Sequence, residues 1–188
     1  MNVRQLLDLT GRVAIITGGS VGLGRQMAEG LAEMGANLVL CARKKDRCEE
    51  AAEQLRQLGI ETLALGCDVK NPADIQGVVD ASMSRFGRID ILINNAGTSW
   101  GAPVEEMRLE HWNKVIETNL TGTFLFSQAV GKIMIRQRRG KITLTLHPWL
   151  ASGARRRSSR QSDITPARAE SSLSPRTWPA SGVSTTSR

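Results

Sequence analysis

The chain has 188 residues, of which 40% are hydrophobic and 23% are charged, and its formal net charge is +7. These values suit one globular domain with or without a tail, and they exclude a wholly disordered chain or a collagen-like fibre. No apolar run reaches the roughly 18 residues of a membrane span, and the first segment does not resemble a signal peptide. The three cysteines form an odd, irregularly spaced set, which is typical of free thiols in a reducing compartment. We therefore expect a cytoplasmic protein with no membrane partner.

The first predicted elements are a strand, a glycine-rich turn and a helix. Residues 13–17 (VAIIT) are apolar and β-branched, which is typical of a buried strand. A helical repeat of apolar residues follows and ends at Gly35, a common helix stop; its members are Leu23, Met27, Leu31 and Met34.

Strands and helices continue to alternate as far as residue 142. Strands are predicted at 37–41, 62–67 and 89–93, helices at 44–58 and 72–86, and a fifth strand from 141. A long helix is predicted over 110–136, with one apolar stripe formed by Val115, Ile116, Leu120, Phe124, Ser127, Val130 and Ile133. Because apolar strands alternate with helices, we predict an α/β fold in which helices cover both faces of a parallel sheet.

Residues 143–188 differ in composition from the part that precedes them. They hold seven arginines, two acidic residues, ten serines and four of the six prolines, a net charge of +5. The first 142 residues have a net charge of only +2. The scattered apolar residues of the last segment cannot bury enough surface to offset chain entropy. We therefore expect one domain over 1–142 and a disordered basic tail over 143–188.

The turn after the first strand favours phosphate binding. Glycines allow a tight turn and let backbone N–H groups approach an anion at the start of a helix. The segment reads Thr17-Gly18-Gly19-Ser20-Val21-Gly22-Leu23-Gly24 and leads directly into the predicted helix. The alternative interpretation is a tight strand–helix turn that binds no ligand.

Further polar residues follow the ends of later strands. Asp68, followed by Val69, can accept a hydrogen bond from an adenine amino group, and Asn94-Asn95-Ala96-Gly97 lets the backbone pass close to a ribose. Asn119 lies inside the long predicted helix, where asparagine is a poor helix former. The alternatives are strand-end capping for Asp68 and Asn95, and a packing amide for Asn119.

These motifs together resemble the short-chain dehydrogenase/reductase family over residues 1 to about 142. The resemblance rests on TGGSVGLG, NNAG and Asn119, and the segments LCAR and 98–104 are similar to gluconate 5-dehydrogenase-like and 3-oxoacyl reductase members. It implies a Rossmann-like, doubly wound sheet, here truncated after the fifth strand, an NAD(P) cofactor, and hydride transfer between an alcohol and a carbonyl. Family members are usually homo-oligomers.

The resemblance also implies roles for individual residues. Gly18, Gly22 and Gly24 would line the diphosphate, together with Thr17, Ser20 and Leu23 of the same turn. Asp68 and Val69 would line the adenine, and Asn95, Ala96 and Gly97 the ribose. Asn119 would support a proton-relay water.

The residues after the second strand favour NADP over NAD. NAD-preferring folds commonly place an acidic residue at this strand end, whereas the chain has Cys41-Ala42-Arg43-Lys44-Lys45. The Arg43 guanidinium could pair with a 2′-phosphate. The alternative is that these cations only solvate the start of the next helix.

The chain departs from the family pattern in its catalytic residues. The family uses a serine and a Tyr-x-x-x-Lys motif beyond the fifth strand, and a neighbouring lysine lowers the pKa of that tyrosine. The sequence contains no tyrosine, and its last lysine is Lys141. We therefore expect the 188 residues to retain the cofactor half of an oxidoreductase and to be inactive. A cluster of histidines that could hold a metal is also lacking.

A frameshift near codon 143 is our hypothesis for this departure. Read from the third base of the Asp163 codon, the codons through Arg168 permit Tyr-His-Ala-Ser-Lys. The same offset permits a family-like fifth strand with its serine upstream, and further family-like blocks downstream. The nucleotide sequence of codons 142–188 tests the hypothesis, because stop codons in the alternative frame, or the absence of a tyrosine codon there, would refute it.

Two other functions stay open at the level of sequence. The chain could be a non-catalytic dinucleotide-binding or regulatory protein. The segment 155–160 (RRRSSR) could instead attract nucleic-acid phosphates, although it lacks interleaved aromatic residues, so nucleic acid is the less favoured partner.

Overall fold

The structure is a computed structural model that describes residues 3–145, and from residue 5 onward also their side chains. The elements in chain order are α1 (Val3–Leu7), β1 (Val13–Thr17), α2 (Gly22–Glu33), β2 (Asn37–Ala42), α3 (Lys45–Arg56), β3 (Thr62–Gly66), α4 (Pro72–Phe86), β4 (Ile91–Asn94), η1 (Val104–Glu106), α5 (Leu109–Ile116), η2 (Glu117–Thr121), α6 (Gly122–Gln137) and β5 (Lys141–Leu144). Helix α1 and the short 3-10 helix η1 have no counterpart in the prediction. Residues 146–188 lie outside the described residues. They include most of the predicted tail and the codons from Asp163 to Arg168 on which the frameshift hypothesis rests.

The five strands form one parallel sheet in the order β3-β2-β1-β4-β5. Strand β1 is central, and its Ile15 is paired with Val39 of β2 and Leu92 of β4. The chain builds outward from β1 to β3 and then crosses back to β4 and β5. This confirms the predicted α/β, Rossmann-like doubly wound sheet.

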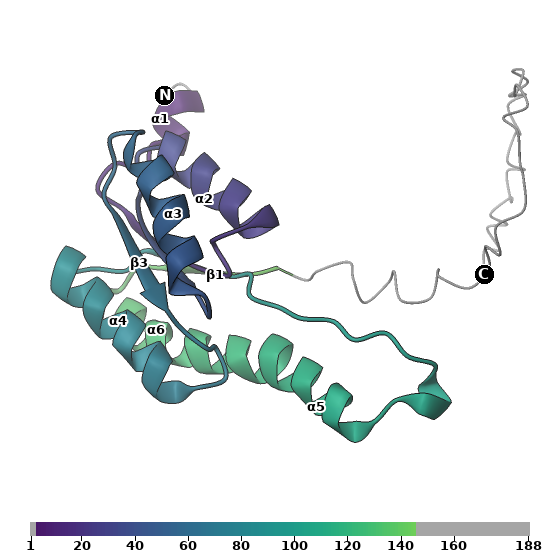
Figure 1. Cartoon of the computed structure of the whole chain (residues 1–188). Coiled ribbons are helices and arrows are strands. Elements are labelled where there is room, and N and C mark those ends of the chain that lie inside the picture. The colour runs from purple at the N-terminus through teal and green to yellow at the C-terminus, as the bar shows by residue number, and fades with distance from the viewer. Residues whose placement is uncertain (1–2, 146–188) are drawn as a thin grey trace, which may run out of the picture. The chain divides into compact units, whose positions relative to one another are not determined.

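Helices cover both faces of the sheet (Figure 1). Helices α2 and α3 pack on one face over Ala14, Ile16 and Leu40, while α4 and α6 pack on the other over Ile15 and Leu92. All five residues of β1 are buried because both faces of the central strand are covered.

Helix α2 meets the sheet through small residues. Its buried positions are Gly24, Ala28 and Ala32, whereas Leu23 and Met34 of the predicted apolar repeat are 44% and 36% exposed. The spacing of the large residues therefore predicted the helix and two of its core contacts, Met27 and Leu31, but not the fully buried small residues. Small side chains let the helix backbone approach the strands closely, and this places the glycine turn over the edge of the sheet.

The long helix predicted over 110–136 is three elements rather than one. Helices α5 and α6 are joined by η2, a single π-helical turn, which adds one residue to the helical repeat. This shift explains why Leu120 and Phe124 of the predicted stripe are 63% and 59% exposed, while Phe126 is fully buried. The predicted stripe was wrong at these two positions, whereas Val115 and Ile116 are half-buried and Val130 and Ile133 are buried.

Strand β5 is an exposed edge of the described sheet. Its four residues are exposed, including Ile142 and Leu144. It runs two residues past the domain boundary that we expected at 142, because Thr143 and Leu144 pair with Ile93 and Asn94 of β4. The predicted truncation after the fifth strand fits this exposed edge.

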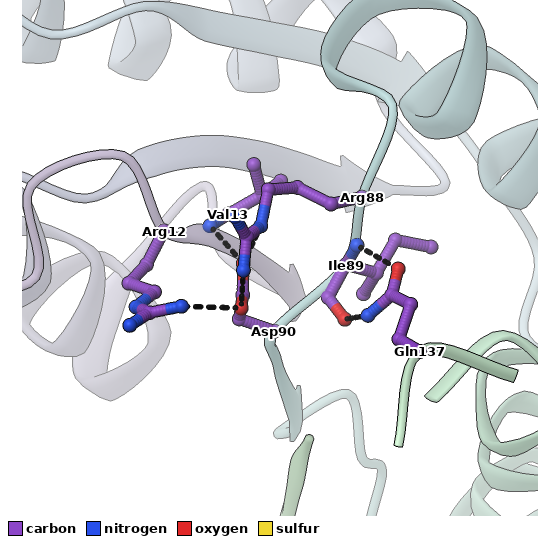
Figure 2. Close-up of polar contacts among 6 residues, drawn as sticks. All are labelled: Arg12, Val13, Arg88, Ile89, Asp90 and Gln137. Atoms are coloured by element: carbon purple, nitrogen blue, oxygen red, sulfur yellow. Dashed lines mark hydrogen bonds and ion pairs between the residues drawn. The ribbon is translucent and has the colours of Figure 1, made fainter. Parts of the chain in front are cut away.

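A buried carboxylate ties the amino ends of the central strands together (Figure 2). Asp90 is 4% exposed and accepts hydrogen bonds from the Arg88 guanidinium at 2.6 and 2.7 Å, from the Val13 backbone at 3.1 Å and from Arg12 at 3.3 Å. Burial raises the pKa of Asp90, but the bonds from Arg88 and Val13 outweigh this and lower it below its ordinary value. The side-chain amide of Gln137 at the end of α6 binds both backbone groups of Ile89, at 3.1 and 2.8 Å.

Candidate functional site

A cavity of about 500 Å³ lies at the carboxyl ends of the strands and is lined in part by the start of α2 and by Lys114 of α5. This volume is in the range of small-molecule sites. Every residue of the predicted cofactor site except Thr17 lines it. The lining residues are Gly18, Ser20, Val21, Gly22, Leu23, Gly24, Ala42, Arg43, Cys67, Asp68, Val69, Lys70, Asn95, Ala96, Gly97, Thr98, Lys114 and Thr118.

The glycine turn is shaped by positions that only glycine fits well. Gly18 and Gly22 have φ angles of +65° and +59°, in the left-handed region that L side chains rarely adopt. A Cβ on Gly24 would lie 2.3 Å from the Gly18 carbonyl oxygen and 2.4 Å from Asn95 Nδ2. The first helical turn of α2 has no side-chain cap from Val21. The backbone N–H groups of this turn are therefore available to bind an anion in the cavity.

Thr17 lies beneath the cavity and joins β1 to the end of β4. Its hydroxyl oxygen accepts hydrogen bonds from the backbone N–H groups of Asn95 and Ala96, at 3.0 and 2.9 Å. Asn95 Nδ2 in turn donates to the carbonyl oxygens of Thr17 and Gly18, at 3.1 and 3.2 Å. The structure thus shows Thr17 positioning the end of β4 beneath the cavity rather than lining it, and its membership of the cofactor site stays a prediction.

Asp68 and Val69 form the wall of the cavity beyond β3. Asp68 Oδ1 accepts a hydrogen bond from the Lys70 backbone at 3.0 Å, so the capping interpretation holds, and the residue also lines the cavity. Val69 packs against the start of α6, where a Cβ on Gly122 would lie 2.8 Å from Val69 Cγ2. The close approach at Gly122 fixes the position of this wall.

Asn119 occupies the π-helical turn η2 and binds the backbone after β4. Its Oδ1 accepts a hydrogen bond from Thr98 N and its Nδ2 donates to Thr98 O, both at 2.8 Å. The side chain does not line the cavity, so the packing interpretation describes its contacts in the structure. Its support of a proton-relay water stays a prediction.

The structure adds residues that the sequence reasoning did not nominate. Lys70, Lys114 and Thr118 line the cavity, and Lys70 forms an ion pair with Glu117 at 3.5 Å. Lys114 and Thr118 are one helical turn apart, and Thr118 directly precedes Asn119. That spacing was a usable signal, since residues four apart lie on one side of a helix. The cavity lining carries three cations, with Arg43 the third, and one acid, Asp68.

The cysteines near the cavity are buried free thiols, as predicted. A hydrogen bond with Cys67 and burial raise the pKa of Cys41 well above its ordinary value, and burial raises the pKa of Cys48. A thiol with a raised pKa is a poor nucleophile at neutral pH. The raised pKa values therefore argue against a nucleophilic role for Cys41 and Cys48.

Two other classes of site find no support in the described part of the chain. Within residues 3–145 there is no group of three His, Cys, Asp or Glu side chains that could hold a metal ion. Among the same residues no helix is long and apolar enough to cross a membrane.

Comparison with known proteins gives matches over the same region. The sequence profile of the family described as "short chain dehydrogenase" matches residues 12–146. The rhamnolipid-biosynthesis 3-oxoacyl-[acyl-carrier-protein] reductase of Pseudomonas aeruginosa is 40% identical over 117 residues, 62% of this chain and 45% of that protein. The D-threitol dehydrogenase of Mycolicibacterium smegmatis is 40% identical over 134 residues, 71% of this chain and 52% of that protein.

A solved structure shares the fold over most of the described residues. The crystal structure of NAD⁺-bound xylitol dehydrogenase aligns with a TM-score of 0.72 at 32% sequence identity, and the match covers 79% of this chain and 56% of that chain. The chain therefore spans about half the length of the relatives that it matches.

Proposed function

Since the chain belongs to the short-chain dehydrogenase family, a family of oxidoreductases, we propose that residues 1–142 are its nicotinamide-dinucleotide-binding domain. The reaction of the whole protein would transfer hydride between an alcohol and a carbonyl of a small molecule. The bound cofactor supplies or accepts the hydride. The domain holds and orients it.

One observation supports this proposal most directly. A single cavity collects the glycine turn after β1, Asp68 and Val69 after β3, and Asn95 after β4. A dinucleotide needs anion-binding backbone at one point and hydrogen-bonding strand ends beside it, and the residues present fit both needs. The close contact at Gly24 leaves the turn compact enough for such an approach.

We propose NADP as the preferred cofactor. Arg43 follows β2, lines the cavity and has no ion pair among the described residues. A guanidinium at this position can bind a 2′-phosphate through two parallel hydrogen bonds. The competing choice is NAD, which the xylitol dehydrogenase of similar fold binds as NAD⁺ in its crystal structure.

We further propose that the 188 residues do not catalyse the reaction. No tyrosine occurs in the sequence and no lysine follows Lys141. Among the described residues that line the cavity there is no tyrosine, and therefore no lysine paired with a tyrosine. Binding without turnover is the expected behaviour, and in that sense the chain is a non-catalytic dinucleotide binder.

The test is a titration of the purified chain with NADPH and NADH, followed by cofactor fluorescence. We expect NADPH to bind about 10-fold more tightly, which corresponds to about 1.4 kcal/mol. Arg43→Gln should remove this difference. The matched control is Arg47→Gln, which changes an exposed arginine of α3 that does not line the cavity and should keep the difference.

Three outcomes would each contradict a different part of the proposal. Failure of both dinucleotides to bind would refute dinucleotide binding itself. Hydride transfer above background with any member of a panel of carbonyl compounds would refute the proposed inactivity. A preference for NADH would refute the role of Arg43 alone.

A further inference from the structure

A second cavity, of about 350 Å³, lies at the amino end of β3, which is an edge strand of the described sheet. Its lining includes Arg56 at the end of α3, Phe86 at the end of α4 and Thr62 at the start of β3. It shares no lining residue with the cavity of the proposed function. Its volume is near the lower limit of small-molecule sites, so a ligand here would be small.

The hydroxyl group of Thr62 is buried in the wall of this cavity without a partner. Its oxygen has no hydrogen bond within the described residues, although Thr62 is only 8% exposed. The Glu61 carbonyl oxygen accepts from Leu38 N of β2 at 2.9 Å, so the backbone N–H and C=O groups of Thr62 face away from β2, toward the edge of the sheet. There the Arg56 guanidinium donates to the Thr62 carbonyl oxygen at 3.0 Å. Because buried hydroxyl groups nearly always have a partner, Thr62 favours a ligand that supplies one.

The rim of this cavity carries both signs of charge. Arg85 and Glu61 line it and form an ion pair with each other, and their side chains are 61% and 55% exposed. Such an exposed pair is weak, so a ligand that offers both charges can exchange with it. Arg56, in contrast, is held by the carboxylates of Glu49 and Glu53, each at 2.8 Å, and stabilises the fold.

The rest of the lining is apolar. Ile60, Leu63 and Phe86 are half-buried there. Leu63 and Phe86 pack against the core on the α4 and α6 side of the sheet, and Ile60 packs against the core on the other side. The cavity therefore reaches both faces at this edge, where an apolar group of a ligand would leave water.

We propose that this cavity binds an α-amino acid with an apolar side chain similar in size to that of leucine. The carboxylate of the ligand pairs with Arg85 and accepts a hydrogen bond from the Thr62 hydroxyl group. Its ammonium group pairs with Glu61, and its side chain contacts Phe86. A zwitterion uses both charges of the rim, whereas a simple anion or a simple cation would meet a like charge there. The inference goes beyond the proposed function and does not depend on it.

The test compares L-leucine with three analogues that each lack one part of it. 4-Methylpentanoate lacks the ammonium group, L-leucinamide lacks the carboxylate, and glycine lacks the apolar side chain. Each compound is titrated into the full chain labelled with ¹⁵N-phenylalanine, which gives three amide NMR signals because the sequence has three phenylalanines. The Phe86 signal is assigned by its loss in Phe86→Leu, and its movement reports binding. We expect leucine to bind about fivefold more tightly than any analogue, as suits exposed charge pairs.

Two variants test the assigned contacts against a matched control. Arg85→Gln removes the charge in the last turn of α4, and Thr62→Val keeps the shape of the side chain but removes its hydroxyl group. Each should weaken leucine binding about fivefold. Arg136→Gln changes the arginine in the last turn of α6, which does not line this cavity, and should bind leucine as the wild type does.

Urea unfolding separates a ligand contact from a structural role of Thr62. Because its hydroxyl group has no partner within the described fold, Thr62→Val should unfold at a urea concentration no lower than that of the wild type. A lower midpoint would show that the hydroxyl group serves the fold, and would overturn its assigned contact.

The remaining outcomes are assigned as follows. Leucine preferred over all three analogues supports the inference. An analogue that binds as tightly as leucine, a Phe86 signal that none of the four compounds moves, or unchanged leucine affinity in Arg85→Gln or in Thr62→Val would overturn it. All of these variants should bind NADPH as the wild type does, so a failed dinucleotide titration bears on the proposed function alone.

Discussion

The two ends of the sheet are built differently. At the amino ends of β1 and β4, the buried Asp90 carboxylate is surrounded by donors from Arg88, Arg12 and the Val13 backbone. At the carboxyl ends of the same strands, small residues and backbone surround a cavity of about 500 Å³. One end satisfies its polar groups within the chain, and the other presents backbone and cations to a ligand. Substitutions at the two ends should therefore separate stability from binding.

The largest effect is expected from Gly24→Ala, which tests the binding role of the carboxyl end. The added Cβ would lie 2.3 Å from a backbone oxygen of Gly18, so the turn must shift. We expect affinity for NADPH to fall about 100-fold, or about 2.7 kcal/mol. Cofactor fluorescence measures the affinity, and urea unfolding shows whether the chain still folds.

Gly30→Ala is the matched control on the same helix. A Cβ at Gly30 meets nothing within 4 Å, and alanine is the better helix former, so stability should rise by about 0.5–1 kcal/mol. NADPH affinity should not change. Equal losses of affinity in the two variants would show that α2 as a whole, rather than the contact at Gly24, controls the site.

At the amino end, Asp90→Asn should weaken the fold without weakening binding. The substitution removes the charge that two guanidinium groups share, and we expect the free energy of unfolding to fall by about 2 kcal/mol. Urea unfolding measures this loss. Glu110→Gln, which changes the exposed pair with Arg108, should cost less than about 0.5 kcal/mol. A loss of NADPH affinity in folded Asp90→Asn would break the separation of the two ends.

Gln137→Met probes a smaller contribution at the amino end. It keeps the volume of the side chain but removes both hydrogen bonds to the Ile89 backbone. We expect a loss of about 1–2 kcal/mol in the free energy of unfolding, because buried backbone groups lose their partners. Hydrogen exchange of the Ile89 amide should accelerate with it, and an unchanged exchange rate would contradict the assignment.

The pH dependence of stability is the smallest expected effect in the comparison of the two ends. The pKa of Asp90 is lowered in the folded chain, so its contribution is complete above its unfolded pKa of about 4 and is lost as the pH falls through the folded value. Urea midpoints measured from pH 6 down to pH 3 should therefore fall more steeply for the wild type than for Asp90→Asn. Parallel curves would show that Asp90 does not carry the effect.

Sequence patterns predicted the parts of the molecule that depend on local chemistry. The apolar runs at β1 and β2 gave strands because both faces of these strands are buried. The glycine turn and the strand ends at Asp68 and Asn95 meet in one cavity because parallel strands bring their carboxyl ends to one edge of the sheet. The residues that line the cavity from these segments were thus predictable.

Features that depend on packing between distant segments were not predictable in the same way. The buried side of α2 follows from small residues such as Ala28, which carry little hydrophobic signal. The π-helical turn at Asn119 is a backbone irregularity that satisfies the Thr98 backbone, and periodicity cannot show it. The spacing of Lys114 and Thr118 placed them on one side of a helix, but periodicity alone does not show that this side borders the cavity.

The extra residue in η2 has a consequence for how this segment tolerates change in its gene. Loss of one codon among those for residues 117–121 would convert the turn to regular α-helix and rotate α5 by about 100° relative to α6. The rotation would carry the Lys114 ammonium away from the cavity while leaving the sheet intact. A single in-frame deletion here would therefore change the lining of the cavity while leaving the supporting sheet as it is.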